Sequence, residues 1–359
     1  MRIIHFIHTL YGGVASVAAN IINEQIKNNI NVTVAYVNID PAFDTMLNTT
    51  IEKVHVNVKS YPGYTMLYGM NIPQVVKMVK KRYPNEDIIV HAHNVQTVGL
   101  FTNLKGIKIV CTLHSLRGND KGIRPIISDF IYRTILKRII KYNGKLTSVS
   151  RAIADYYNRD RCPIEIIYNG SSARGHKKEH EKFTIGHVGN ISYAKGWDLT
   201  SYGFSLVPSH IRKNMLFLSA GKPASFSIEA IKKRLEDLCI NGNSKYLGFV
   251  NNAIEKLFPE LDVLVLASRN EGLGLVLIEA LAYGIPIIGT KVGGIPEVVE
   301  DGVNGFIVHT PEDIAKRIQM LYSDHELYKK ISAQAKECFA DKFTSSAMFD
   351  KYNKIYKNL

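Results

Sequence analysis

The sequence predicts an α/β protein with two domains, each built on a doubly wound parallel sheet. Three observations support this fold class. Short apolar runs alternate with helical patterns along the whole chain. The length of 359 residues exceeds that of a typical single domain, so two domains are expected. A polar stretch without apolar periodicity, residues 170–182, separates two such alternating halves.

The first half begins with an apolar run that ends at a pair of glycines. Gly12 and Gly13 stand where a strand turns into a helix, and free backbone N–H groups favour an anion at such a place. The dinucleotide fingerprint G-x-G-x-x-G does not occur here. The expected strands of this half are 2–7, 31–37, 87–91, 107–112, 145–149 and 164–167, and the expected helices are 13–27, 72–82, 95–104 and 126–142.

The second half repeats the alternation after the polar stretch. A strand is followed by a loop that contains Lys195, and a helix begins at Trp197. The expected strands are 183–189, 215–220, 245–250, 263–267, 285–289 and 305–308, and the expected helices include 227–240, 253–258, 275–283 and a final one at 343–359.

Residues 262–300 form the segment around which the chain is organised. A buried strand leads into a turn with Gly272 and Gly274, then into a helix that Gly284 stops. Glu271 stands just before the helix and Glu279 about two turns inside it. One carboxylate can therefore lie beside a group bound at the helix N-terminus, while the other accepts hydrogen bonds from hydroxyls further along. The alternative is a simple turn followed by a solvated helix residue.

Composition is typical of a globular α/β protein, but the charge is uneven. The net charge is +13, and residues 1–180 hold 24 Lys and Arg against 12 Asp and Glu, while residues 181–359 hold 21 against 20. This asymmetry predicts that the first half meets an anionic partner, either nucleic acid or a membrane surface. Four scattered cysteines lack metal-type spacing and predict reduced thiols in a cytoplasmic protein: Cys111, Cys162, Cys239 and Cys338.

The segment around Glu271 and Glu279 resembles the donor-site signature of family-four GT-B retaining glycosyltransferases, the glycosyl transferases group one. The resemblance continues through Gly293-Gly294-Ile295-Pro296-Glu297 and Gly302-Val303-Asn304-Gly305. It implies a GT-B fold, in which two Rossmann-like domains face a cleft. Residues 1–172 would bind the acceptor and residues 182–342 the nucleotide-sugar donor, while the helix 343–359 crosses back onto the first domain.

The resemblance also implies roles for particular residues. Lys195 lies in a loop, 189–196, that resembles the family's diphosphate loop. Asn190 stands where the family usually has an arginine, so either another cation, with Arg269 as the candidate, replaces it or the donor is held differently. His114 occupies the position of the histidine that reaches the donor sugar, whereas His91 and His93 are expected to be structural. Glu271 would contact sugar hydroxyls and Glu279 the ribose. The remaining donor contacts expected are Gly12 and Gly13 near the phosphates, Phe249 and Val250 near the base, and the backbone N–H groups of Gly272, Leu273, Gly274 and Leu275.

The implied reaction moves a hexose or N-acetylhexosamine from a nucleotide-diphosphate sugar to a glycan hydroxyl with retention of configuration. No Asp-x-Asp pair offers a seat for a divalent metal, so no metal and no cofactor are expected. Two alternatives stay open at this stage: a nucleotide-sugar epimerase of the same fold, and a non-catalytic subunit that binds nucleotide sugars, suggested by Asn190. Nucleic acid is not expected as a partner because no recognition module is visible.

The basic first half suggests where the acceptor is located. The helix expected at 126–142 carries an apolar face and a basic face, a pattern that fits either an anionic membrane surface or a core-packed helix with a solvated basic side. We therefore expect a cytoplasmic enzyme that associates peripherally with the inner face of the cell membrane. Its expected acceptor is an intermediate of O-antigen or capsule type, with a polyprenyl-diphosphate-linked glycan as the lipid-linked form.

Overall fold

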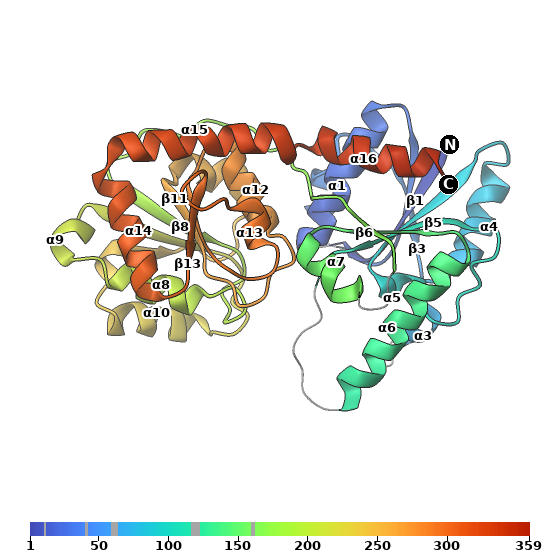
Figure 1. Cartoon of the computed structure of the whole chain (residues 1–359), viewed down its shortest axis with the longest axis horizontal. Helices are drawn as coiled ribbons and strands as arrows, with labels where there is room; N and C mark the ends of the chain where they lie inside the picture. The colour runs from blue at the N-terminus through green and yellow to red at the C-terminus, as the bar shows by residue number, and fades with distance from the viewer. Residues whose placement is uncertain (11, 40–41, 59–63, 116–122, 159–161) are drawn as a thin grey trace. The chain divides into compact units, whose positions relative to one another are not determined.

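The computed structural model describes residues 1–359 apart from 11, 40–41, 59–63, 116–122 and 159–161. The chain folds into two compact units (Figure 1). The first comprises Met1–Gly170 together with Ser345–Leu359, and the second comprises Ser171–Thr344. The polar stretch that follows Gly170 in the sequence is thus part of the second unit.

The first unit is built on a seven-stranded, wholly parallel sheet with the strand order β3-β2-β1-β4-β5-β6-β7. Its central strands are apolar and buried, as expected when helices cover both faces of a parallel sheet. The strands are β1 (Arg2–Leu10), β2 (Asn31–Ile39), β3 (Glu52–His55), β4 (Ile88–His93), β5 (Lys108–Leu113), β6 (Lys145–Ser148) and β7 (Ile164–Ile166).

Four helices of the first unit differ from the sequence-based expectation: α5 is shorter than expected, and α2, α3 and α7 were not expected. The helix expected at 95–104 ends at Val98, because Gly99 has a φ of 75° and a Cβ there would meet the backbone of Gly69 at 2.1 Å. The helices are α1 (Gly12–Lys27), α2 (Ala42–Thr45), α3 (Tyr64–Tyr68), α4 (Ile72–Arg82), α5 (Val95–Val98), α6 (Ile123–Lys141), α7 (Arg151–Tyr157) and α16 (Ser345–Lys357).

The last helix, α16, returns to the first unit after the chain has completed the second. It packs against α1, and Figure 1 shows it drawn in red beside the blue N-terminal helix. Its Tyr352 and Tyr356 are each 2 % exposed, and the Ser345 hydroxyl donates to Glu24 at 2.8 Å. The expected crossing of the C-terminal helix onto the first domain is therefore confirmed.

The second unit is built on a six-stranded parallel sheet with the order β10-β9-β8-β11-β12-β13. The strands are β8 (Phe183–Val188), β9 (Met215–Ala220), β10 (Ser244–Tyr246), β11 (Val263–Leu266), β12 (Ile287–Thr290) and β13 (Gly305–Val308). The helices are α8 (Trp197–Ser205), α9 (Ser209–Arg212), α10 (Ile228–Asp237), α11 (Ala253–Leu257), α12 (Leu275–Ala282), α13 (Ile295–Val298), α14 (Pro311–Ser323) and α15 (His325–Lys342).

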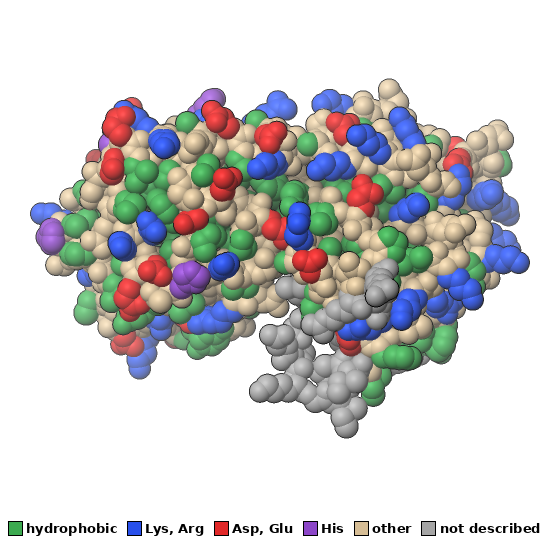
Figure 2. Space-filling view, in the orientation of Figure 1, with side chains coloured by type: hydrophobic (Ala, Val, Ile, Leu, Met, Phe, Trp, Pro, Cys, Tyr) green, Lys and Arg blue, Asp and Glu red, His purple; other side chains and the backbone are tan. Residues whose placement is uncertain are grey.

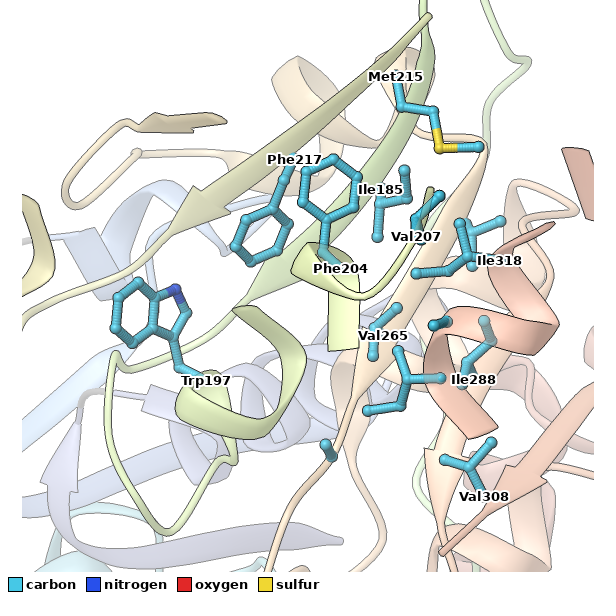
Figure 3. Close-up of a cluster of buried hydrophobic side chains, with 14 of the residues drawn as sticks. Ile185, Trp197, Phe204, Val207, Met215, Phe217, Val265, Ile288, Val308 and Ile318 are labelled. Carbon is cyan, nitrogen blue, oxygen red and sulfur yellow. The ribbon is translucent and has the colours of Figure 1, made fainter. Parts of the chain in front are cut away.

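A single cluster of buried side chains holds α8, α10 and α14 against the sheet of the second unit (Figure 3). Trp197 is fully buried, and its indole N–H donates to Ser219 at 3.0 Å, so its only polar atom is satisfied. Because Trp197 begins α8, this anchor also fixes the loop that precedes the helix. None of the helices among the described residues is long and apolar enough to cross a membrane.

Candidate active site

The strand order of the second unit identifies the position where a ligand is expected. β8 lies between β9 and β11, so the connections from β8 and β11 leave in opposite directions along the sheet. In open α/β sheets, ligands bind beyond the carboxyl ends of the strands at such a switch point. The two loops that meet here are 189–196 after β8 and 267–274 after β11.

A partly buried ion pair joins these two loops. The Lys195 ammonium lies 2.6 Å from a carboxylate oxygen of Glu271, and the same oxygen accepts from the Ser268 hydroxyl at 3.3 Å. The Glu271 side chain is 10 % exposed and that of Lys195 is 33 % exposed. The sequence assigned both residues to the site separately, and the structure brings them into contact.

Glycines allow the backbone to approach closely on both sides of this pair. Gly196 has a φ of 67°, and a Cβ there would lie 1.8 Å from the carbonyl oxygen of Ala267. Gly293 has a φ of 55°, and its Cβ would lie 1.8 Å from the carbonyl oxygen of Glu271. Both positions therefore require glycine. The Gly293-Gly294 part of the signature thus holds the backbone of Glu271 in place.

The helix α12 starts at Leu275, immediately after this loop. Gly274, with a φ of 85°, is its N-cap residue and makes no side-chain cap, so the first N–H groups of the helix are available to an anion. Glu279 lies one turn inside this helix, not two as expected, because the helix begins only at Leu275, and it is 8 % exposed. Burial raises the pKa of Glu279 to about 8, so the side chain is largely protonated at neutral pH.

Arg269 does not supply the cation that is missing at Asn190. Its guanidinium makes two hydrogen bonds of 2.8 Å to the carboxylate of Asp198, and it also donates to the Tyr193 carbonyl at 2.7 Å. The side-chain hydrogen bond with Asp198 raises the pKa of Arg269. This arginine therefore fixes the loop 189–196 to the start of α8, and its charge is already paired.

Lys222 is a basic residue of this edge that the sequence interpretation missed. Its carbonyl accepts from the backbone N–H of Ile191 at 2.9 Å, so it lies directly beside the loop that contains Asn190. Its ammonium lies 4.7 Å from the centroid of the Phe249 ring, which is 57 % exposed. In the sequence, Lys222 could have been identified as a site residue because it directly follows Gly221 at the end of β9. Val250, next to Phe249, is partly buried.

The other predicted site residues belong to the first unit. Gly12 and Gly13 are exposed at the start of α1, and a Cβ at either position would meet no described atom within 4 Å. His114 follows β5 directly and is partly buried, and its backbone N–H donates to Asn94 at 3.2 Å. His91 and His93 are buried inside β4, and their ring nitrogens lie within hydrogen-bond distance of Thr112 and His114.

Two family models match the chain in succession. The model for glycosyltransferase family 4 matches residues 11–172, and the model for glycosyl transferases group 1 matches residues 171–338. The chain belongs to the group 1 glycosyltransferases. The boundary between the two matches coincides with the division between the two folded units.

Similar proteins include both curated glycosyltransferases and solved structures. N-acetyl-α-D-glucosaminyl L-malate synthase of Bacillus anthracis is 28 % identical over 336 residues, 86 % of this chain and 84 % of its own length. The capsular polysaccharide biosynthesis glycosyltransferase CapM of Staphylococcus aureus is 28 % identical over 64 % of this chain and 60 % of its own. The crystal structure of Anabaena HepE in complex with UDP superimposes over the whole of both chains with a TM-score of 0.80 at 18 % identity. These matches confirm the GT-B fold and show that the protein is a glycosyltransferase.

Proposed function

We propose that this glycosyltransferase moves a hexose or N-acetylhexosamine from a nucleotide-diphosphate sugar to a glycan hydroxyl, with retention of configuration. The observation that carries the proposal is the Lys195–Glu271 pair, which lies at the switch point beside the free N-terminus of α12. An ammonium and unpaired backbone N–H groups are the groups that stabilise a departing diphosphate. The solved complex of HepE with UDP-glucose supports a uridine diphosphate sugar as the donor.

Each group at this edge has a role in the proposed reaction. The bond between the sugar C1 and the diphosphate breaks, and the acceptor oxygen bonds to C1 from the same face as its proton passes to the leaving phosphate. Lys195 and the N-terminus of α12 offset the charge that develops on the diphosphate. Glu271 orients the sugar hydroxyls, Glu279 the ribose, and Phe249 stacks on the base. Lys222 provides the positive charge that the usual arginine would have supplied at Asn190.

Donor turnover tests this function directly. The purified protein, incubated with a panel of nucleotide sugars and EDTA, is expected to release nucleoside diphosphate from one of them, because its own cations replace a metal. Glu271→Ala is expected to lower that release at least a hundredfold. The control Glu326→Ala changes an exposed glutamate on α15 and should have no effect. A donor that is converted without any acceptor into an epimeric nucleotide sugar would contradict transferase chemistry.

We also propose that the acceptor is lipid-linked and that α6 contacts the membrane that contains it. The C-terminal half of α6 packs into the core through Ile135, Leu136 and Ile139, but Ile127 is 54 % exposed and Phe130 69 % exposed. The core therefore covers the C-terminal part of the expected apolar face, while Ile127 and Phe130 at its N-terminal part are exposed. Figure 2 shows Lys and Arg side chains beside apolar ones along this helix. Exposed apolar groups flanked by basic ones fit an anionic bilayer surface.

Vesicle binding measures this contact. We expect the protein to bind vesicles that contain phosphatidylglycerol at moderate salt, and we expect Ile127→Ser combined with Phe130→Ser to weaken binding about tenfold, since two apolar side chains no longer enter the interface. The matched control, Leu206→Ser combined with Ile228→Ser, removes two exposed apolar residues of the second unit. Equal binding by both double variants, or none by the wild type, would exclude α6 as the membrane contact.

A further inference from the structure

A chain of histidines crosses the sheet of the first unit and ends at His114. His5 lies on β1, His93 on the neighbouring β4, and His114 follows β5. The side chain of His5 is fully buried and that of His93 is 2 % exposed, so the links inside the chain are shielded from water. Gln25 of α1, also fully buried, stands at the far end.

Consecutive hydrogen bonds connect these side chains. His5 Nε2 lies 2.8 Å from Gln25 Oε1, and His5 Nδ1 lies 3.0 Å from His93 Nε2. His93 Nδ1 lies 3.0 Å from His114 Nε2. Both ring nitrogens of His5 and of His93 are therefore used. His114 Nδ1 ends the chain, and no hydrogen bond joins it to any of the described residues.

Because the rings of this histidine chain are neutral, every hydrogen bond along it must run in the same direction from donor to acceptor. Burial lowers the pKa of His5 and of His114 to about 4, and it lowers the pKa of His93 well below the usual value, so all three rings are neutral near pH 7. A neutral imidazole has one N–H donor and one acceptor nitrogen. The direction of every link in the chain is consequently set by the group at its end.

Tyr356 of α16 fixes the orientation of that end group. The Gln25 amide nitrogen donates to the Tyr356 hydroxyl at 3.4 Å, which turns Oε1 towards His5. The same hydroxyl lies 2.7 Å from His91 Nδ1, and His91 Nε2 lies 2.7 Å from the Thr112 hydroxyl. Because the Tyr356 hydroxyl accepts from Gln25, its single proton is available to His91 Nδ1, and this side branch is compatible with the same direction.

The tautomers follow in order from Gln25. Its oxygen can only accept, so His5 carries its proton on Nε2 and accepts at Nδ1. His93 must then donate from Nε2 and accept at Nδ1, so His114 donates from Nε2. We propose that Gln25, oriented by Tyr356, acts through His5 and His93 to hold His114 as the Nε2–H tautomer, with the Nδ1 lone pair left to accept a hydrogen bond from a bound ligand.

These residues are positioning residues for His114. The proposal rests on the proposed function only for the identity of the ligand, which would be a hydroxyl of the donor sugar; the tautomer itself can be measured without substrate. The nitrogens of His5, His91 and His93 also lie within 4.8 Å of one another, which is close enough for one metal ion. Each of these nitrogens already takes part in a hydrogen bond, so the geometry favours the neutral chain over a metal.

Nitrogen-15 spectra of the full-length protein labelled at histidine test the proposal. Two-bond correlations to the ring protons distinguish Nε2–H, Nδ1–H and charged rings, and the His114 signals are identified by their loss in His114→Asn. We expect His114 as the Nε2–H tautomer near pH 7. An Nδ1–H tautomer or a charged ring in the wild type would overturn the proposal, and so would zinc-induced shifts of His5, His91 and His93.

Gln25→Leu removes the acceptor at the end of the chain. The Nε2–H of His5 would then lack a partner, so the reversed chain becomes favourable and His114 should show a substantial Nδ1–H population. The control Thr112→Val removes a hydroxyl that contacts His91, Thr147 and Tyr352 but none of the links from Gln25 to His114, so it should leave the His114 tautomer unchanged. An unaltered His114 spectrum in Gln25→Leu would overturn the proposal.

Donor turnover by the same variants distinguishes the proposal about the histidine chain from the proposed role of His114 at the donor. We expect Gln25→Leu to lower kcat for donor turnover about tenfold, while Thr112→Val stays close to the wild type. If the His114 tautomer reverses in Gln25→Leu but turnover does not change, the coupling of Gln25 to His114 through the histidine chain is established. The role of His114 at the donor is then rejected. If the tautomer stays Nε2–H in Gln25→Leu, the chain is rejected whatever the turnover.

Discussion

Lys195→Met and Glu271→Gln are expected to change the affinity for UDP in opposite directions. The Lys195 ammonium lies 2.6 Å from the Glu271 carboxylate, so a diphosphate must compete with that carboxylate for the cation. Removing the ammonium should weaken UDP binding about tenfold, whereas removing the negative charge of Glu271 should strengthen it about threefold. Turnover of the sugar nucleotide should nevertheless fall at least a hundredfold in both variants, because each loses a group that acts in the transition state.

Calorimetric titration with UDP checks the two affinities. Lys245→Met serves as the control, since this exposed lysine is on the edge strand β10 of the same sheet. Thermal unfolding of each variant shows whether the fold is retained when one member of the ion pair is lost. Weaker UDP binding by Glu271→Gln would mean that Glu271 holds the nucleotide itself and does not compete with it.

Glu279→Gln is expected to stabilise the protein at pH 8 by about 4 kcal/mol and to change its stability little at pH 5. The pKa of the Glu279 carboxyl is about 8 in the folded protein, against 4.5 as its ordinary value. Between these two values the native state keeps a proton that the unfolded chain has released, so the wild type loses stability as the pH rises. Glutamine resembles the protonated side chain and does not titrate, so the variant lacks this loss.

Urea unfolding at pH 5, 6.5 and 8 measures the effect. The wild type should lose about 1.4 kcal/mol per pH unit relative to the variant over this window. Glu326→Gln, on an exposed side chain, should follow the wild type at every pH. If wild type and Glu279→Gln show the same pH dependence, the Glu279 carboxyl is ionised in the native state.

Most of the sheet strands were predictable because they are apolar and short. The strands Met215–Ala220 and Gly305–Val308 agree with the sequence-based bounds. β3 was missed because Glu52–His55 has three polar residues in four and lies at the edge of the sheet, where burial does not require apolar side chains. The end of α5 at Val98 depended on a contact between Gly99 and Gly69, thirty residues apart, which no local pattern contains.

The residues of the site were predictable, but their pairing was not. Motif spacing identified Lys195 and Glu271, whereas their contact depends on how two loops of the same sheet edge approach each other. The same reason explains Arg269, which was considered as a replacement cation but is bound to Asp198 of α8. The histidine chain likewise draws its members from two strands, a loop and two helices, so no local sequence pattern contains its contacts.

The return of α16 to the first unit has a consequence for biosynthesis. Residues 171–344 form a continuous stretch, so the second unit can fold as soon as it leaves the ribosome. The first unit is made earlier but lacks α16, and until translation reaches Lys357 the face of α1 that α16 covers stays open to water. The domain that is synthesised first is therefore completed last, and a nascent chain stalled before residue 345 would depend on chaperones to protect that apolar face.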